Sequence, residues 1–235
     1  MQEDINIKLQ YHSRLNPKIW QSNMKIRPEL RSKLLQFGKT WQTFAGIPNA
    51  AVVDVTLTGG NANFNYTPFS DLDVHILVDK KKLTAFGPKL DEFMQAKKQL
   101  WTLTHNVKIL GYPLEPYAQA HDSVFSKGQG VYSLKNDRWL QEPKFQSGIN
   151  FRQDPKLKQK VQYYMDTIDS IIKNKMGQGA VDSLKTKLRT MRAAAISAGG
   201  EQSFENLVFK ELRNQGYLDK LNSYEKTKLD KKLSL

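Results

Sequence analysis

Cysteine is absent from this sequence of 235 residues, and its absence excludes several kinds of site at once. A chain without cysteine has no disulfides, no zinc–thiolate centre, no iron–sulfur cluster and no cysteine nucleophile. Any metal ion that this protein binds must therefore be held by oxygen or histidine ligands.

Long apolar runs are also missing, since no stretch approaches the roughly 18 residues that a membrane-spanning helix needs. The N-terminal sequence MQEDINIKLQ is polar and has no apolar segment of the kind that a signal peptide carries. Hydrophobic residues make up 39% and aromatic residues 10% of the chain, which is more than disordered chains contain. We therefore expect a folded, soluble, cytoplasmic protein.

Acidic residues are too few to balance the basic ones, and the net charge is +13. Residues 1–50 have 8 Lys/Arg against 3 Asp/Glu, residues 51–150 have 11 against 10, and residues 151–235 have 17 against 10. A nearly neutral centre between basic segments suits a catalytic core whose flanks hold a polyanion. Simple solubility explains the same charge equally well.

Hydrophobic spacing predicts a helix followed by two strands in the first third of the chain. Segment 28–45 has apolar residues at intervals of three and four after a proline suited to a first helical turn, and Gly46 and Pro48 end it. Branched apolar residues then predict strands within 50–60 and 71–79.

The next segments predict a second helix and a further strand. Residues 89–104 have the amphipathic pattern of a helix, and residues 106–120 are predicted to form a strand. We expect Gly111, Pro113 and Pro116 to break this strand and to confine it to a sheet edge or a bulge.

The last part of the chain predicts a hairpin and then helices only. The hairpin lies within GVYSLKNDRWLQEP and turns at Asn136 and Asp137. Helices are expected at about 155–175, 180–197, 203–215 and 218–232. The predicted fold class is α/β (α+β): a short mixed β-sheet flanked by helices, with a C-terminal helical region. The predicted domains are a catalytic core over 1–150 and a helical domain over 151–235.

Two aspartates one residue apart begin the strand expected at 71–79. Side chains alternate across a strand, so Asp71, Asp73 and His75 share one face. The two carboxylates then stand roughly 6 to 7 Å apart at the backbone, where they repel each other unless a cation neutralises them. Oxygen ligands favour a hard ion, so we expect Mg²⁺ or Mn²⁺.

A glycine pair, Gly59 and Gly60, precedes these aspartates with ten residues between them. Glycines at a turn between strand and loop let backbone N–H groups approach phosphate oxygens. Magnesium usually takes one or two protein carboxylates and completes its coordination with water and substrate phosphates. The combination predicts a nucleoside triphosphate as substrate.

The pattern Gly-Gly, ten residues, Asp-Leu-Asp-Val resembles the signature of the DNA polymerase β-like nucleotidyltransferase superfamily. The order of helix, strand, glycine pair, acidic strand, helix and strand also resembles the core of that superfamily, over about residues 28–118. Within it, LNPKIW, GGNANFNYTPFSDLDVH, GVYSLKNDRW and ENLVFKELRNQGYLDKL are similar to small bacterial and phage-encoded nucleotidyltransferases.

This resemblance implies a third carboxylate on the following strand, and Glu115 is the only acid between Glu92 and Asp122. Asp71 and Asp73 would bind two ions, and Glu115 would help hold the ion that activates the attacking hydroxyl. Many relatives have a serine where this chain has a glycine at position 60. The phosphate contact of that serine would then come from backbone amides, Asn61 or Ser70.

For other candidate residues, a structural role explains the sequence as well as a functional role does, or better. We interpret His75 as a packed histidine that supports the site and not as a ligand. Lys127 lies in a glycine-rich loop from which it could reach phosphates, although most loop lysines are merely solvated.

The helical sequence LKTKLRTMR sets Lys185, Arg189 and Arg192 on one face of a helix. With Lys187, the two arginines are further candidates for phosphate binding, and an ordinary surface helix is an equal alternative.

The sequence therefore predicts a metal-dependent nucleotidyltransferase that transfers NMP from an NTP to a hydroxyl and releases pyrophosphate. The basic flanks favour a nucleic-acid acceptor, in particular an RNA 3′ end, while a small molecule or a protein hydroxyl remains an alternative. A non-catalytic nucleotide or nucleic-acid binder of the same fold is the competing hypothesis. The sequence indicates neither the preferred base nor the oligomeric state.

Overall fold

The chain forms two compact units in a computed structural model that describes residues 5–83, 87 and 89–234. One unit, His12–Ser147, contains the β-sheet, and the other joins Met1–Tyr11 to Gly148–Leu235. We call them the sheet unit and the helical unit. None of the described helices is both long and apolar enough to cross a membrane.

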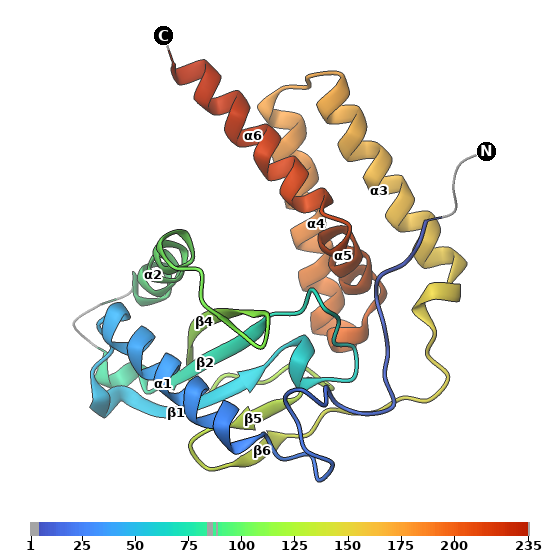
Figure 1. The fold of residues 1–235 in the computed structure, drawn as a ribbon. Helices are drawn as coiled ribbons and strands as arrows, with labels where there is room; N and C mark the ends of the chain where they lie inside the picture. Colours follow the sequence, from blue (N-terminus) through green and yellow to red (C-terminus); the bar gives the residue numbers. More distant parts are fainter. Residues whose placement is uncertain (1–4, 84–86, 88, 235) are drawn as a thin grey trace. The chain divides into compact units, whose positions relative to one another are not determined.

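The sheet unit is built on six strands in the order β3-β4-β2-β1-β5-β6 (Figure 1). β1 pairs antiparallel with β2 and β5, whereas β2 pairs parallel with β4, so the sheet is mixed. This confirms the predicted fold class. The strands are β1 Val52–Thr58, β2 Leu72–Val78, β3 Lys108–Ile109, β4 Tyr112–Ala120, β5 Val131–Ser133 and β6 Arg138–Gln141.

Helix α1, Pro28–Ala45, packs closely against one face of this sheet. A Cβ at Gly38 would lie 3.0 Å from Val55 Cγ1 and 3.8 Å from Val74 Cγ1, so the helix backbone approaches β1 and β2 directly. Leu72, Val74 and Ile76 of β2 are therefore on the α1 face. Asp73 and His75 are on the opposite face because side chains alternate along the strand.

Helix α2, Leu90–Thr104, packs against α1 and β4. Trp101 lies edge-on to Phe37 and Phe44 of α1, at 5.8 and 5.1 Å between ring centroids. Such aromatic pairs stabilise a helix contact beyond the area that they bury. The predicted bounds of both helices are confirmed to within one residue.

Strand β4 runs unbroken through Pro113 and Pro116, so the expectation that these prolines interrupt it was wrong. Only the break at Gly111 is present, where the chain turns from β3 into β4. The two-residue strand β3 pairs with Tyr112 and Pro113, and the Leu114 N–H donates to the Val107 oxygen at 3.0 Å. Among the described strands, β4 then pairs from residue 115 onward with β2 alone. Proline is tolerated there because the missing N–H would point away from the partner strand.

The predicted hairpin is formed by β5 and β6, and it turns where expected. Asp137 has a positive φ of 51° and accepts a hydrogen bond of 2.7 Å from the Tyr132 hydroxyl. The Tyr132 ring also packs on Trp20 and Trp139, at 5.0 Å from each ring centroid. This hairpin and cluster close the β1 side of the sheet.

The helical unit contains four α-helices around an apolar core. Asp154 caps the first of them by accepting hydrogen bonds from the backbone N–H groups of Lys156 and Leu157, and Pro155 follows at the first helical position. The helices are α3 Pro155–Lys173, α4 Gln178–Gly199, α5 Phe204–Asn214 and α6 Tyr217–Leu233 (Figure 1).

An N-terminal segment completes the core of this helical unit. Ile7 and Leu9 are 1% and 2% exposed among the apolar side chains of the helices. The buried Glu211 carboxylate accepts hydrogen bonds of 2.9 Å from the backbone N–H groups of Lys8 and Leu9. The helices thus depend on a segment about 200 residues away in the sequence, which no local pattern indicates.

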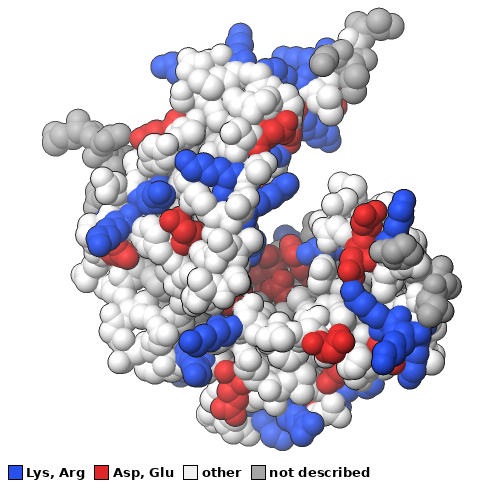
Figure 2. All heavy atoms as spheres, turned by 180° about the vertical axis from the view of Figure 1, so that it is seen from behind, with Lys and Arg blue, Asp and Glu red and all other residues white. Residues whose placement is uncertain are grey.

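Basic side chains are spread over the surface, as the face drawn in Figure 2 shows. The sheet unit, residues 12–147, has 18 Lys/Arg against 11 Asp/Glu, and the remaining residues have 18 against 12. The net charges are therefore +7 and +6, so both units are basic when they are divided by structure.

Candidate active site

The predicted site residues meet where β2 and its two neighbours lie in register. Asp73 pairs with Thr58 of β1 on one side and with Glu115 of β4 on the other. In-register residues of adjacent strands point to the same face of the sheet. Asp73 and Glu115 therefore stand side by side, and both are partly exposed. Asp71, also partly exposed, immediately precedes β2.

Gly59 is fitted to the carboxylate of Asp73. Its φ of 78° is in the left-handed region, and a Cβ at this position would lie 1.7 Å from Asp73 Oδ2. Only glycine allows both the backbone conformation and the close approach of the carboxylate. The structure thus explains why residue 59 is a glycine: its backbone lies against the Asp73 carboxylate.

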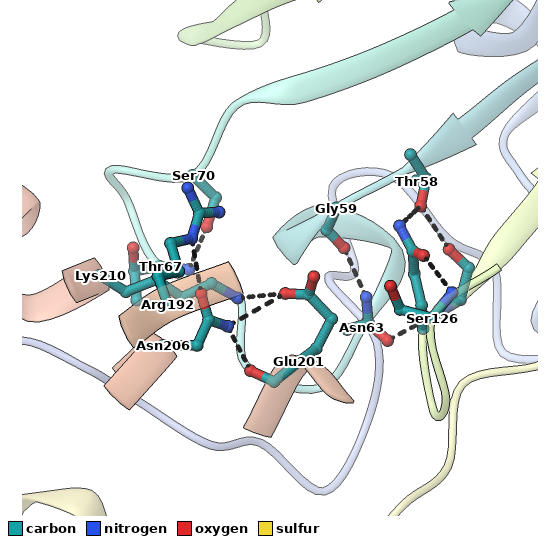
Figure 3. Close-up of polar contacts among 12 residues, drawn as sticks. Thr58, Gly59, Asn63, Thr67, Ser70, Ser126, Arg192, Glu201, Asn206 and Lys210 are labelled. Atoms are coloured by element: carbon teal, nitrogen blue, oxygen red, sulfur yellow. Dashed lines mark hydrogen bonds and ion pairs between the residues drawn. The ribbon is translucent and has the colours of Figure 1, made fainter. Parts of the chain in front are cut away.

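Gly60 has the same kind of relation to Ser70. A Cβ at Gly60 would lie 3.0 Å from Ser70 Oγ, so this hydroxyl occupies the space that a side chain at position 60 would take. Ser70 is 5% exposed, and its Oγ accepts a hydrogen bond of 2.9 Å from the backbone N–H of Thr67, drawn in Figure 3. Ser70 therefore stands beside the glycine pair, and its contact with phosphate stays a prediction.

Asn61 is fully buried, and its side chain holds the loop together. Its Nδ2 donates to the backbone oxygen of Asp71 at 2.9 Å, and its Oδ1 accepts from Asn16 Nδ2 at 2.9 Å. Both polar atoms of the amide thus have protein partners, whereas the sequence suggested a phosphate contact. In the structure this residue positions the backbone that carries Asp71.

Further polar residues, which the sequence analysis did not single out, anchor the glycine turn. Asn63 Nδ2 donates to the Gly59 oxygen at 2.6 Å, and Asn63 Oδ1 accepts from the Gly130 N–H at 2.9 Å (Figure 3). Thr58 Oγ1 donates to the Gly130 oxygen at 2.9 Å and accepts from Gln129 Nε2 at 2.7 Å. The three asparagines within NANFN could have indicated this anchoring in the sequence, because asparagine side chains commonly bond to the backbone of loops.

These bonds also bring the loop that carries Lys127 to the end of β1. The loop closes on itself through Gln129, whose N–H donates to the Ser126 oxygen and whose Oε1 accepts from the Ser126 N–H. Lys127 is exposed at the tip of this loop. The structure thus places its backbone on the same side of the unit as Thr58 and Gly59.

Glu115 is already paired with a cation. Lys98 Nζ, from α2, lies 2.9 Å from Glu115 Oε2, with side-chain exposures of 25% and 39%. The same ammonium group lies 5.6 Å from the centre of the Tyr117 ring, on the next residue of β4 that faces this way. The lysine was not singled out from the sequence, because the contact joins a helix to a strand across 17 residues.

His75 belongs to the packing around the site. Its Nδ1 is 2.9 Å from Gln119 Oε1, and its ring lies 5.2 Å from that of Tyr117. Burial lowers the pKa of His75 to about 4, against the opposing effect of the hydrogen bond with Gln119. The ring is therefore neutral at pH 7, in agreement with the interpretation of a packed histidine.

The donor set at this end of the sheet consists of carboxylates. Within the described part of the chain, no group of three or more His, Asp or Glu side chains is close enough to hold a metal ion. Asp71 and Asp73 supply hard oxygen donors that suit Mg²⁺ or Mn²⁺, and Glu115 is held by Lys98. To join them as a third ligand, Glu115 would have to exchange its lysine partner.

The predicted cations of α4 have partners within the helical unit. Arg192 Nε donates to Asn206 Oδ1 at 2.9 Å, and its guanidinium lies 4.6 Å from the centre of the Phe209 ring. Lys187 lies over the Tyr164 ring at 5.9 Å, and Arg189 is one of the charges that lower the pKa of the Glu225 carboxyl. Their role in phosphate binding stays a prediction.

A second cluster of charges in this unit surrounds Glu201. Lys210 Nζ lies 2.8 Å from Glu201 Oε2, and both side chains are more than four-fifths buried. Burial alone would raise the pKa of Glu201, but Lys210 and Arg192 outweigh it and hold that pKa below its usual value. Figure 3 draws the contacts that join Glu201 to Lys210 and Asn206.

Comparisons with known proteins leave the family of this chain undetermined. No known family matches the sequence, and no curated protein is similar to it. Among solved structures, a STING-associated CdnE c-di-GMP synthase from Capnocytophaga granulosa matches over 86% of this chain and 81% of its own, with 12% identity and a TM-score of 0.21. A TM-score this low does not by itself establish a common fold. The functional argument therefore rests on the site.

Proposed function

We propose that the protein is a metal-dependent nucleotidyltransferase that transfers a nucleoside monophosphate from an NTP to a hydroxyl group. The observation that carries this proposal is the fit of Gly59 to the Asp73 carboxylate, with Glu115 in register beside it. A glycine turn against an acidic strand puts a phosphate-accessible backbone next to oxygen ligands for a cation. This is the arrangement that the resemblance to polymerase β-like enzymes implies.

In this reaction the acceptor oxygen attacks the α-phosphorus, the bond from the α-phosphorus to the bridging oxygen breaks, and pyrophosphate leaves. The acceptor hydroxyl loses its proton to solvent. Asp71 and Asp73 would hold Mg²⁺ or Mn²⁺, which when bound neutralises phosphate charge and lowers the pKa of the hydroxyl. The backbone of the Gly59–Gly60 turn would contact the triphosphate, and the buried network of Asn61 and Asn63 keeps the turn rigid.

The acceptor that we propose is a nucleic-acid 3′ end, in particular that of RNA. Both structural units have an excess of basic residues, and basic surface attracts the phosphate backbone irrespective of sequence. A protein hydroxyl or a small molecule as acceptor would not require this charge.

The ion pair of Lys98 with Glu115 favours a second candidate, a non-catalytic nucleotide or nucleic-acid binder. A protein that only binds nucleotides does not need Glu115 as a third carboxylate ligand for metal ions. The two functions differ in one observable, because a binder retains NTP without releasing pyrophosphate.

The test is to incubate the protein with α-labelled NTPs, Mg²⁺ or Mn²⁺ and total RNA, and to measure label transfer and pyrophosphate. Asp73→Asn should abolish both. Asp122→Asn is the matched control, because this exposed aspartate follows the opposite end of β4, and it should leave both unchanged. NTP binding without pyrophosphate release, for every NTP and with cell lysate as an additional acceptor, would establish the binder instead.

A further inference from the structure

The sheet unit contains an open cleft of about 720 Å³ that the proposed chemistry does not use. It lies between the first turns of α1 and the hairpin that joins β3 to β4. Its volume is within the range of ligand-binding pockets. The lining residues that matter here are Lys18, Arg27, Lys33, Lys108, Ile109 and Leu110.

The cleft has a strong positive charge. Four cationic side chains line it against one acid, Glu29, and all five are exposed. Throughout the described residues, none of these cations forms an ion pair with a carboxylate: Arg27 Nε donates to the Pro17 oxygen, and Lys18 lies over the Tyr112 ring. Unneutralised cations on the wall of a concave surface attract an anion.

The start of α1 adds to this field. Arg27 is the N-cap residue, and its side chain makes no capping hydrogen bond. Pro28 has no N–H, so the N–H groups of Glu29 and Leu30, with the positive end of the helix dipole, lie next to the basic side chains. Backbone N–H groups in this position bind phosphate oxygens.

At the rim of the cleft, the exposed side chain of Leu110 is presented by a strained backbone conformation. Leu110 has a φ of 54° and Gly111 a φ of 85°, as in the two-residue turns that favour Asn-Gly. A leucine in the left-handed region costs roughly 1 kcal/mol, yet Leu110 is 51% exposed and gains little from burial. Strain without a packing benefit indicates a functional contact.

The cleft is joined to the candidate active site by a short chain of buried hydrogen bonds. Asn16, which directly precedes Pro17 and Lys18, donates from Nδ2 to Tyr112 Oη and to Asn61 Oδ1, both at 2.9 Å. Asn61 in turn holds the backbone of Asp71. Because β2 and β4 are parallel, the turn before β4 also lies at the same end of the sheet as Asp71.

We propose that this cleft binds single-stranded nucleic acid, with phosphates on the cations and the start of α1, and a base against Leu110 and Ile109. Such binding sites combine a positively charged groove with side chains on which the bases stack, and Leu110 and Ile109 would take that place here. An acidic peptide would use the charges but not the apolar wall. The inference rests on the proposed function, in which the bound nucleic acid is the acceptor of the nucleotide.

The test is fluorescence anisotropy with labelled single-stranded RNA and DNA of about 12 nucleotides. Lys33→Glu with Lys108→Glu should weaken binding at least about tenfold and reduce the slope of log K against log salt by about 1 to 2. The matched control is Lys81→Glu with Lys89→Glu, which changes the charge equally at the opposite end of β2, beside Asp79 and the start of α2. It should change the affinity by less than about twofold.

A second variant separates binding from folding. Leu110→Asn places a residue that favours a positive φ in the turn, so it should raise the melting temperature and still weaken oligonucleotide binding about threefold. Unchanged oligonucleotide affinity in this variant would contradict the role of Leu110.

Several outcomes would overturn the proposal. Equal losses in the two double variants would show that only the total charge matters. Equally strong competition by a free mononucleotide or by an acidic peptide would assign the cleft to those ligands. The proposed function and the present inference can fail separately. If pyrophosphate release depends on Asp73 but Lys33→Glu with Lys108→Glu leaves oligonucleotide binding unaffected, only the present inference is wrong.

Discussion

At the scale of single residues, the glycine pair is explained by the acidic strand that follows it. The sequence pattern placed the glycines near the aspartates, and the structure shows that Gly59 is in contact with the Asp73 carboxylate itself. Spacing could indicate that the two belong together because a strand and the loop before it are close in sequence. It could not show that Lys98 reaches Glu115, since that contact depends on how α2 packs.

Gly59→Ala should destabilise the protein more than the backbone strain alone explains. A positive φ costs an alanine about 1 to 2 kcal/mol, and displacement of Asp73 adds about 1 to 3 kcal/mol for an overpacked site. Gly46→Ala is the control, because Gly46 has a φ of 74° and nothing within 4 Å of its Cβ position. Urea unfolding measures both, and equal losses would show that the Asp73 contact is unimportant.

Lys98→Met should strengthen Mn²⁺ binding about fivefold, because a half-exposed ion pair is worth up to about 1 kcal/mol and its loss frees the Glu115 carboxylate. Titration followed by Mn²⁺ EPR measures this without any turnover. The neighbouring Lys97→Met removes the same charge from a side chain that lies over Phe44 and Phe93. If the two variants bind Mn²⁺ alike, Lys98 does not compete for the third carboxylate.

His75 should make the protein sensitive to acid. Its pKa falls from 6.5 in the unfolded chain to about 4 in the folded protein, because burial disfavours the cation. The unfolded state therefore binds more protons between these values, and stability is lost as the pH falls from about 6.5 to 4, by up to about 3 kcal/mol. His75→Gln should flatten the curve of unfolding free energy against pH. Identical curves for wild type and His75→Gln would exclude this role.

At the scale of elements, local sequence determined the helices better than the strands. Pro28 and Gly46 mark α1 at both ends, and the structure has the predicted bounds. Strand β4 was harder to predict because its tolerance of two prolines depends on the length of β3, its neighbour in the sheet. Pairing is a property of two segments, so neither segment shows it alone.

The N-terminal segment is the element that local patterns could not assign. Its fully buried partner Glu211 accepts from the N–H groups of Lys8 and Leu9, and from Gln215 Nε2 at 2.6 Å. Glu211→Gln replaces one acceptor oxygen by a donor and should destabilise the helical unit by about 2 to 3 kcal/mol.

Urea unfolding and hydrogen exchange at the Lys8 and Leu9 amides measure this effect. Glu225→Gln is the control, because its ion pair with Lys185 is partly exposed and its loss should cost less than about 1 kcal/mol. Full protection of the Lys8 and Leu9 amides in Glu211→Gln would contradict the account.

At the scale of the whole molecule, the two units share the positive charge almost equally. The sequence counts suggested basic flanks around a neutral centre, but residues 12–50 are strongly basic and fold into the sheet unit. The cations that line the cleft come from this segment and from Lys108. The cleft that we propose for single-stranded nucleic acid is thus on the unit that carries Asp71 and Asp73. The division into functional domains at residue 150 stays a prediction.

The measurement that tests the central claim most directly is pyrophosphate release from NTPs by wild type, Asp73→Asn and Asp122→Asn, with Mg²⁺ or Mn²⁺ and RNA present. Loss of a single metal-binding carboxylate removes transition-state stabilisation, so we predict release by wild type and Asp122→Asn and at least about a hundredfold less by Asp73→Asn. Equal release by all three proteins, or none by wild type with any NTP or acceptor, would contradict the assignment of these residues to nucleotidyl transfer.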